Sequence, residues 1–284
     1  MTQWLSLFVL NAFASGLSTA DGLPTHAVYG SLLFLINLIE KEKPDYLVIA
    51  SDSSEPTFRH EIYEAYKANR SDMPEDLAKQ IPYIFQAFSA IQAKTLVQPG
   101  VEADDLIGSI ATQITDPDLE VLIVSGDKDF MQLINNQVKM YSPKKGGVVK
   151  LVDEAAVQEK FGVKPSQVID VLALIGDSAD NVPGVPGIGE KGAAKLIQAH
   201  GSLEGIYDNL EGITNKRQLN GLRDNRDQAL LSRRLVTIKL DCPLDFELAD
   251  LACDWQKAIG NDQLLTLAEQ LEFKTLSDRI RELA

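Results

Sequence analysis

Short apolar runs alternate with helical patterns through the first 160 residues, and this order narrows the range of possible folds. We predict strands at 5–10, 46–50, 120–125 and 138–141, and helices at 31–42, 80–92, 103–114 and 129–135. Strands that alternate with helices form a mostly parallel sheet that is covered by helices. Ligands of such a sheet bind beyond the carboxyl ends of its strands. The sequence therefore predicts an α/β fold with its functional site at that edge.

The pattern becomes helical after about residue 160. We predict helices at 165–175 and 190–200, joined by a loop rich in glycine and proline at 176–189, with Gly201 as a C-terminal cap. We therefore expect an α/β domain over residues 1–160 and a helical subdomain over residues 161–284. A chain of 284 residues with 45% hydrophobic residues is long enough for a core of this size.

Eight acidic residues fall in four clusters that the predicted fold turns toward one edge of the sheet. They are Asp52; Glu102, Asp104 and Asp105; Asp127 and Asp129; Asp177 and Asp180. Carboxylates at this density repel one another unless cations neutralise them, and oxygen ligands with few histidines or cysteines favour Mg²⁺ or Mn²⁺. A carboxylate-lined two-metal site is typical of phosphodiester hydrolysis. Single members have an alternative role, since Asp104 or Asp127 could cap a helix, but four clusters at one edge favour a nuclease.

A helix–hairpin–helix pattern occupies residues 185–195. Its glycines let a duplex backbone approach closely, and the free amides at the start of the second helix can bind a phosphate without reading bases. Lys191 and Lys195 add positive charge to this segment. The alternative is an ordinary Gly/Pro turn between two helices.

Aromatic and basic residues are interleaved between positions 58 and 70. They are Phe58, Arg59, His60, Tyr63, Tyr66, Lys67 and Arg70. Stacking side chains beside cations suit single-stranded nucleic acid. A solvated amphipathic helix is the alternative reading of the same pattern.

Composition sets limits on these interpretations. The formal net charge of −14 is unusual for a nucleic-acid binder, but the basic residues are grouped locally, and their distribution matters more than the total. Two cysteines without a CxxC pair argue against a zinc site or a disulfide framework. No apolar run reaches the length of a membrane span. The apolar segment 4–10 lacks the basic residues of a secretory signal and is predicted to be a buried first strand.

Five segments together resemble the bacterial 5′ nuclease family, which is the 5′–3′ exonuclease domain at the front of bacterial DNA polymerase I and is related to flap endonucleases. The segments are TFRHE at 57–61, YKANR at 66–70, GVEADD at 100–105, SGDKD at 125–129, and GDSADNVPGVPGIGEK at 176–191. The resemblance runs from about Asp21 to the segment at 271–274, which is nearly the whole chain.

The resemblance implies a Rossmann-like (PIN-like) nuclease with a helical arch and a helix–hairpin–helix clamp on duplex DNA. Asp52, Glu102, Asp104 and Asp105 match a first metal group, and Asp127, Asp129, Asp177 and Asp180 match a second. Lys67 and Arg70 match arch residues that contact the scissile phosphate. The expected DNA-binding residues are Phe58, Arg59, Tyr66, Gly184, Gly187, Gly189, Lys191 and Lys195.

The resemblance also implies cofactors and partners. These are two Mg²⁺ or Mn²⁺ ions, with K⁺ as a candidate ion at the hairpin, and DNA with a 5′ flap, a nick or a free 5′ end. A DNA polymerase is a candidate protein partner. We expect a monomer that acts in the cytoplasm without a membrane.

The chain departs from the family pattern at its N-terminus. The first strand of the family ends in an Asp-Gly pair, whereas this chain has Asn11-Ala12, so that Asn11 or, in another alignment, Trp4 stands at the place of a metal ligand. Two hypotheses follow. The first is an active structure-specific 5′–3′ exonuclease or flap endonuclease with two-metal catalysis. The second is a DNA-junction binding protein with weakened or lost catalysis.

Overall fold

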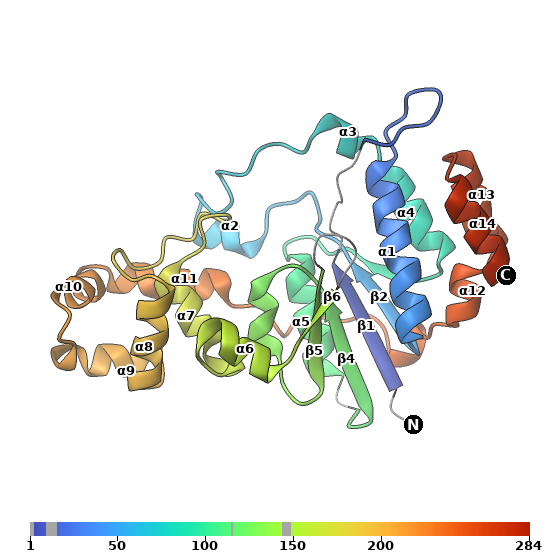
Figure 1. Cartoon of the computed structure of the whole chain (residues 1–284). Helices are drawn as coiled ribbons and strands as arrows, with labels where there is room; N and C mark the ends of the chain where they lie inside the picture. Colours follow the sequence, from blue (N-terminus) through green and yellow to red (C-terminus); the bar gives the residue numbers. More distant parts are fainter. Residues whose placement is uncertain (1–2, 10–15, 115, 144–148) are drawn as a thin grey trace.

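The computed structural model describes residues 3–9, 16–114, 116–143 and 149–284, and its centre is a six-stranded sheet (Figure 1). The strands are β1 (Gln3–Val9), β2 (Tyr46–Ala50), β3 (Lys94–Leu96), β4 (Leu119–Val124), β5 (Val138–Pro143) and β6 (Val149–Val152). Their order is β3-β2-β1-β4-β5-β6. All neighbours pair in parallel except β5 and β6, which are antiparallel. The predicted mostly parallel α/β fold is confirmed.

Helices cover both faces of this sheet because the side chains of its central strands alternate between two apolar cores. Leu47 and Ile49 of β2 pack with α1 (His26–Glu42) and α4 (Ile81–Ala90). Val48 and Ala50 point to the other face and pack with α5 (Ala103–Gln113). Since both faces are buried, the central strands read as continuous apolar runs in the sequence.

The predicted elements agree with the structure in most places. The strand at 46–50 and the helix at 190–200 match, whereas α1 begins at His26, earlier than the predicted 31. The predicted α-helix at 129–135 is instead the 3₁₀ helix η1 (Lys128–Leu133). The short strands β3 and β6 were not predicted.

The segment between β2 and α4 corresponds to the expected arch. It contains α2 (Phe58–Ile62) and α3 (Glu75–Ala78), which have five and four residues, and a non-helical connection joins them (Figure 1). Lys67 in this connection has a left-handed backbone with φ of 56°. The arch is therefore helical only at its two ends.

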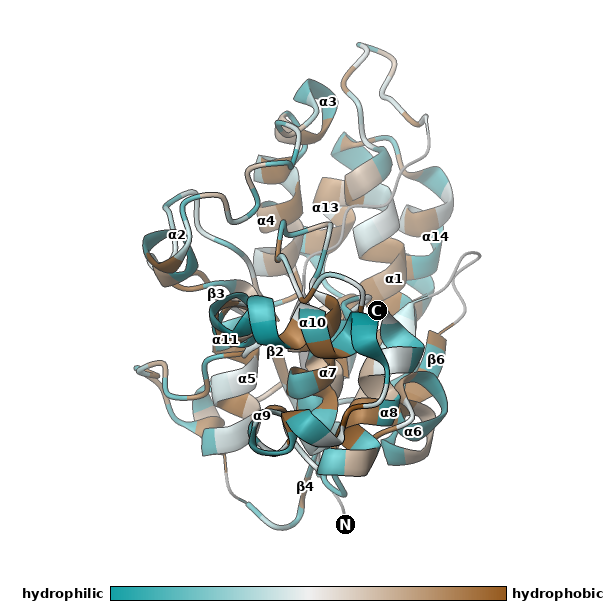
Figure 2. Ribbon diagram, turned by 90° about the vertical axis from the view of Figure 1, so that its left-hand side faces the viewer, coloured by the Kyte–Doolittle hydropathy of each residue, from teal (hydrophilic) through white to brown (hydrophobic). Residues whose placement is uncertain are grey.

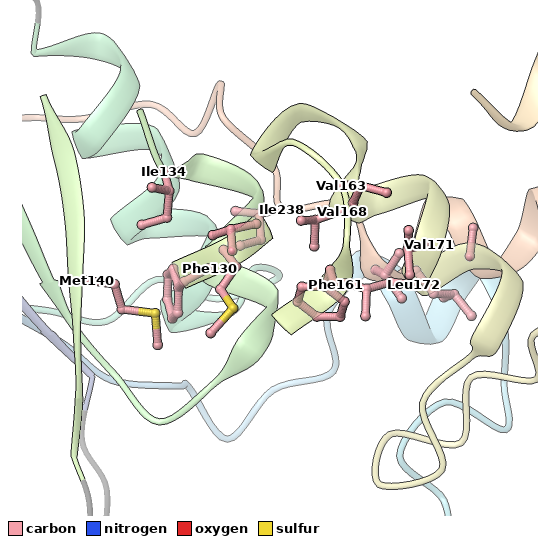
Figure 3. Packing of buried hydrophobic residues seen from close by; sticks show 14 of the residues in the cluster. Phe130, Ile134, Met140, Phe161, Val163, Val168, Val171, Leu172 and Ile238 are labelled. Carbon is pink, nitrogen blue, oxygen red and sulfur yellow. The ribbon is translucent and has the colours of Figure 1, made fainter. Parts of the chain in front are cut away.

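A helical region follows the sheet. It comprises α6 (Glu154–Phe161), η2 (Pro165–Gln167), α7 (Val168–Ile175), α8 (Glu190–His200), α9 (Leu203–Asp208), η3 (Leu210–Gly212), α10 (Lys216–Asp224) and α11 (Arg226–Val236). Its core is continuous with the core of the sheet. Phe130 and Met140 lie next to Phe161, Val168 and Val171 in one buried cluster (Figure 3).

The last helices return to the sheet. After η4 (Leu248–Leu251), the helices α12 (Trp255–Ile259), α13 (Asp262–Gln270) and α14 (Lys274–Leu283) pack beside α1 and α4 (Figure 1). Residues 161–284 thus do not form one helical body, because the final thirty or so complete the α/β part. Among the described helices, none is both long and apolar enough to cross a membrane.

Candidate active site

Asp52 joins the end of β2 to the start of α5. It lies two residues after the strand, and its Oδ1 accepts a hydrogen bond from the backbone N–H of Ala103 at 2.8 Å. Ala103 is the first residue of α5, where the helix dipole favours a negative charge. The predicted approach of the first two acidic clusters is therefore present in the structure.

The surroundings of Asp104 connect its own acidic cluster to the third cluster, which contains Asp127. Burial raises the pKa of Asp104 well above the usual value, and the charges of Asp127, Glu102 and Asp52 raise it further. A carboxylate that is disfavoured by three other carboxylates is a place where a cation would gain energy. Carboxylates from the ends of β2 and β4 and from the start of α5 therefore share one electrostatic environment.

Asp129 lies nearby with an unsatisfied oxygen. Its Oδ1 is buried without a hydrogen-bond partner, while its backbone N–H binds Asp127 Oδ1 at 2.9 Å. Burial, followed by the negative charge of Asp127, raises the pKa of Asp129 to about 8. An orphaned buried carboxylate oxygen needs an explanation, and a missing ion is one of the standard ones.

Three basic side chains neutralise the acids in this structure. Lys67 Nζ lies 2.6 Å from Glu102 Oε1. Arg70 pairs with Asp180, and its Nε donates to Asp180 Oδ1 at 3.1 Å. Lys128 Nζ lies 2.7 Å from Asp177 Oδ2. Burial raises the pKa of Asp177, but the bond and charge of Lys128 together with the backbone N–H groups of Ala179 and Asp180 outweigh burial and lower it.

The arch is held against the loop that carries Asp177 and Asp180. The backbone N–H of Lys67 donates to the Asp180 carbonyl at 3.0 Å. Asn69 Nδ2 donates to the Ser178 carbonyl, and Asn181 Nδ2 donates to the Ala65 carbonyl, each at 2.6 Å. These bonds bring the arch cations to the acids of the fourth cluster.

Arg59 and Asp105 are placed differently from their predicted roles. Arg59 is 2% exposed and Asp105 is 0% exposed, and the guanidinium donates to both carboxylate oxygens at 2.7 and 2.8 Å. Burial alone would lower the pKa of Arg59, but the bonds and charge of Asp105 outweigh this effect and raise it. A buried Arg59 cannot contact DNA here, and the predicted metal ligand Asp105 has its oxygens occupied by protein donors.

Tyr66 and Phe58, the two aromatic residues expected to contact DNA, lie in different surroundings. Tyr66 is buried, and its hydroxyl donates to Glu102 Oε2 at 3.3 Å and lies 3.4 Å from Asp180 Oδ2, so its ring is not available for stacking. Phe58 is half-buried and lines a cavity of about 920 Å³ together with Ile62, Leu230 and Arg234.

The three glycines of the hairpin differ in what a side chain at their position would meet. Gly184 has φ of 65°, and a Cβ there would lie 2.5 Å from the backbone of Gly176. Gly187 has φ of 88° and is covered by the side chain of Arg217. By contrast, a Cβ on Gly189, the N-cap of α8, would meet only open space. Lys191 and Lys195 are exposed on α8.

Two family models cover the chain in succession. The model for the 5′-3′ exonuclease N-terminal resolvase-like domain matches residues 6–162, and the model for the 5′-3′ exonuclease C-terminal SAM fold matches residues 163–275. The chain belongs to the 5′–3′ exonuclease family. This membership confirms the predicted family, and the PIN-like sheet followed by a helical part agrees with both models.

The relatives of this chain include DNA polymerases and a shorter protein that is named as an exonuclease. It is 41% identical to DNA polymerase I of Caldicellulosiruptor bescii over 268 residues, which is 93% of this chain and 31% of that protein. It is 40% identical to the 5′-3′ exonuclease of Buchnera aphidicola over 242 residues, 83% of this chain and 84% of that protein. The chain thus spans about a third of the polymerases that it matches.

Solved structures share the fold of this chain. A bacteriophage T5 flap endonuclease in a pseudo-enzyme-product complex with DNA and metal ions superposes with a TM-score of 0.70 at 20% identity, covering 99% of both chains. The catalytic core of Rad2 in complex with a DNA substrate gives 0.62 at 14% identity, covering 100% of this chain and 93% of that one. At these identities the likeness establishes the fold alone.

The oxygen donors of the candidate site suit hard divalent cations. Among the residues that the structure describes, no three acidic, histidine or cysteine side chains are close enough together to enclose one ion. Mg²⁺ ordinarily keeps several waters and takes only one or two carboxylates, so it does not need such a cage. The unpartnered oxygen of Asp129 and the crowded Asp104 are suitable places for it.

Sequence reasoning missed Lys128 and the two asparagines that fasten the arch. Lys128 stands between Asp127 and Asp129, and this position in the sequence could have indicated a neutralising cation. Asn69 and Asn181 gave no comparable signal, because their partners are backbone carbonyls distant in sequence. Asn11 lies outside the described residues, and the side chain of Trp4 is also outside them.

Proposed function

We propose that this chain hydrolyses phosphodiester bonds of DNA at a 5′ flap, a nick or a free 5′ end with the help of two divalent ions. The observation that carries the proposal is the shared negative environment of Asp52, Glu102, Asp104 and Asp127, beside an arch with two cations. Negative side chains next to positive ones suit a substrate that is an anion and a cofactor that is a cation.

We assign the ion-binding role to seven acids and leave out Asp105. They are Asp52, Glu102, Asp104, Asp127, Asp129, Asp177 and Asp180. Bound divalent ions supply a water of lowered pKa and stabilise the charge of the in-line displacement. Mg²⁺ and Mn²⁺ are the candidates, because the ligands are carboxylate oxygens.

The arch cations act on the substrate. When Lys67 and Arg70 exchange Glu102 and Asp180 for a phosphate, they orient the scissile bond and neutralise its charge. The hairpin holds duplex DNA through the amides near Gly187 and Gly189, with Lys191 and Lys195 on the phosphates and K⁺ as a candidate ion. Arg217 of α10 lies against Gly187 and extends this basic surface. Hydrophilic segments lie toward both ends of α10 (Figure 2).

The protein partners and the location are part of the same proposal. A DNA polymerase fits as a partner, since in the relatives named DNA polymerase I a segment similar to this chain makes up about a third of the length. We propose that the chain acts as a monomer in the cytoplasm.

Asn11 favours a second candidate, a protein that binds DNA junctions with weakened or lost cleavage. An amide attracts a divalent ion less than a carboxylate does, because the charge of the ion dominates such a site. The site would then hold one negative charge fewer than in relatives with an aspartate there.

Cleavage of 5′-labelled flap, nicked and single-stranded DNA in Mg²⁺, Mn²⁺ or EDTA tests both candidates. We expect metal-dependent cleavage near the junction, and we expect Asp104→Ala to abolish it while exposed Asp262→Ala leaves it unchanged. Asn11→Asp should raise the rate most at low Mg²⁺. Tight junction binding without cleavage in either metal would favour the binding protein.

A further inference from the structure

Arg59 lies where three parts of the molecule meet. It belongs to α2 at the base of the arch, and its guanidinium binds Asp105 in the first turn of α5. Its Nε donates to the Leu235 carbonyl at 2.8 Å, and its Nη2 donates to the Thr237 carbonyl at 3.0 Å. These two carbonyls belong to the end of α11. One side chain therefore connects the arch, the helix that carries the site acids and the helical region.

Asp105 completes the same connection from the other side. Its Oδ1 also accepts the backbone N–H of Lys239 at 2.8 Å, and its Oδ2 accepts the backbone N–H of Glu102 at 3.0 Å. Glu102 and Asp105 form the capping box of α5. Asp105 thus fixes the backbone of Glu102 relative to the chain that leaves α11.

The carboxylate of Glu102 is fixed by the same group of residues. Arg59 Nη1 lies 3.4 Å from Glu102 Oε2, and Tyr66 donates to that oxygen at 3.3 Å. Both the backbone and the side chain of Glu102 therefore depend on the position of Arg59. A shift of Arg59 would move a carboxylate of the candidate metal site.

The path continues from α11 to the hairpin. Ser232 Oγ accepts the backbone N–H of Gly184 at 2.9 Å, and Gln228 Nε2 donates to the Gly184 carbonyl at 2.7 Å. A continuous series of hydrogen bonds thus runs from the hairpin through α11 and Arg59 to Glu102.

Stability alone gives little reason for a buried ion pair at this joint. Taking two charges out of water costs about as much as their attraction returns, and apolar residues of similar size often replace such pairs without loss. Arg59, in contrast, donates four hydrogen bonds in different directions from Nε, Nη1 and Nη2, whereas a lysine has only three N–H donors on a single nitrogen. The pair is therefore suited to fixing geometry.

We propose that Arg59 and Asp105 are positioning residues that transmit the docking of duplex DNA on the hairpin to the carboxylate of Glu102. The inference rests on the proposed function, because it assigns duplex to the hairpin and ion binding to Glu102. Binding of duplex would tighten α11 against the hairpin, and the two carbonyls at its end would hold Arg59 and hence Glu102 in place.

Hydrogen exchange in EDTA tests the connection without cleavage. We expect a blunt DNA duplex to slow amide exchange over residues 100–106 in the parent chain. Arg59→Lys keeps a positive charge beside Asp105 but cannot also reach both carbonyls, so it should lose this protection while duplex affinity stays within about twofold. Protection that persists in Arg59→Lys would overturn the proposal.

Cleavage kinetics give a second measurement. On flap substrates with short and long duplex arms, the longer arm should raise kcat in the parent, and Arg59→Lys should lower kcat on the longer arm by roughly 2- to 30-fold with little change in KM. Arg233→Lys is the matched control, because Arg233 also lies on α11 and pairs with Asp170 at 3.3 Å inside the helical region. An equal effect of both variants would overturn the assignment.

Two further variants test the proposal. They are Asp105→Asn and the apolar double variant Arg59→Met with Asp105→Leu. The double variant avoids leaving one buried charge unpaired. It should reduce the effect of duplex arm length on kcat as strongly as either single change. Asp105→Asn and Arg59→Lys should weaken Mn²⁺ binding by the DNA-free protein to a similar, small extent, because both act only through the position of Glu102. A much larger loss in Asp105→Asn than in Arg59→Lys would instead make Asp105 a ligand. A parent chain that protects residues 100–106 but cleaves nothing would count against the nuclease and not against the connection.

Discussion

At the scale of single residues, the surroundings of Asp129 disfavour the charged form of its carboxyl group. One of its oxygens is buried without a partner, and its pKa is raised to about 8 by burial and by Asp127. Its pKa in the unfolded chain is close to 3.8. Folding therefore favours the protonated form, and stability falls as the pH rises from the unfolded pKa to the folded one. Asp104 contributes in the same direction.

We expect the free energy of unfolding in EDTA to fall by roughly 1 to 2 kcal/mol between pH 6 and pH 8. Asp129→Asn should reduce this slope and raise stability at pH 8, whereas exposed Asp262→Asn should leave the slope as it is. Urea unfolding at several pH values measures it. Millimolar Mn²⁺ should restore stability at pH 8 by binding the folded state. Unfolding energies that are level across this range would show that Asp129 is not enclosed as described.

The sequence predicted which acidic residues lie close together better than it predicted the residues to which they hydrogen-bond. Two acidic clusters were placed by the predicted strands before them and a third by its position at the start of a helix, and Asp52, Asp104 and Asp127 do share one environment. The role of Asp105 could not be predicted from charge alone, because its partners Arg59 and Lys239 are distant in sequence. Only the spacing of Glu102 and Asp105, which suits a capping box, gave a local indication.

At the scale of elements, substitutions of two hairpin glycines should have different effects, one mainly on stability and the other mainly on DNA binding. Gly184→Ala places a Cβ against backbone at a positive φ, and it should destabilise the protein by at least about 1 to 3 kcal/mol. Gly189→Ala meets open space, so it should cost no more than about 1 kcal/mol, which is the difference between glycine and alanine as the N-cap of α8.

Thermal melting and fluorescence anisotropy with duplex DNA measure the two effects. The methyl group of Gly189→Ala would stand where a phosphate approaches, so it should weaken duplex binding several-fold in a folded protein. If Gly189→Ala binds duplex as tightly as the parent, the start of α8 is not the contact.

Elements were predicted well where a long apolar run or a strong helical period existed. The strand β2 and the helix α8 match their predicted bounds. The strand β3 has only three residues, and half of β6 is exposed, so neither has a period that can be recognised. The segment after Asp127 has a helical composition, but its 3₁₀ form depends on tertiary contacts such as the bond of Gln132 to the Val236 carbonyl.

At the scale of the whole molecule, the last helices should be necessary for folding of the α/β part. Leu264, Leu267, Leu271, Leu276 and Ile280 are buried against α1 and α4. Burying a leucine or isoleucine contributes about 1.5 to 3 kcal/mol, so their sum is comparable with the net stability of a domain. A chain that ends at residue 253 should therefore lose cooperative unfolding.

Circular dichroism melting of this shortened chain measures the effect. Phe273→Ala is a milder variant at the same contact, since Phe273 packs edge-on against Tyr29 with ring centroids 5.1 Å apart, and it should cost about 3 to 5 kcal/mol. A shortened chain that melts cooperatively at the parent temperature would contradict the prediction.

The overall organisation was predicted only in part. The α/β sheet, the helical region and the family follow from the order of elements and motifs. The return of α12 to α14 to the first part could not be predicted, because an amphipathic helix shows which of its faces is buried but not what covers that face.

This return also sets an order of events during synthesis. The sheet and α1 emerge first from the ribosome, but the apolar face beside α1 and α4 stays open until α12 to α14 have been made. Contacts between residues that far apart in the chain form slowly, and exposed apolar surface in the meantime favours aggregation. The nascent chain therefore has reason to need a chaperone until α14 has emerged.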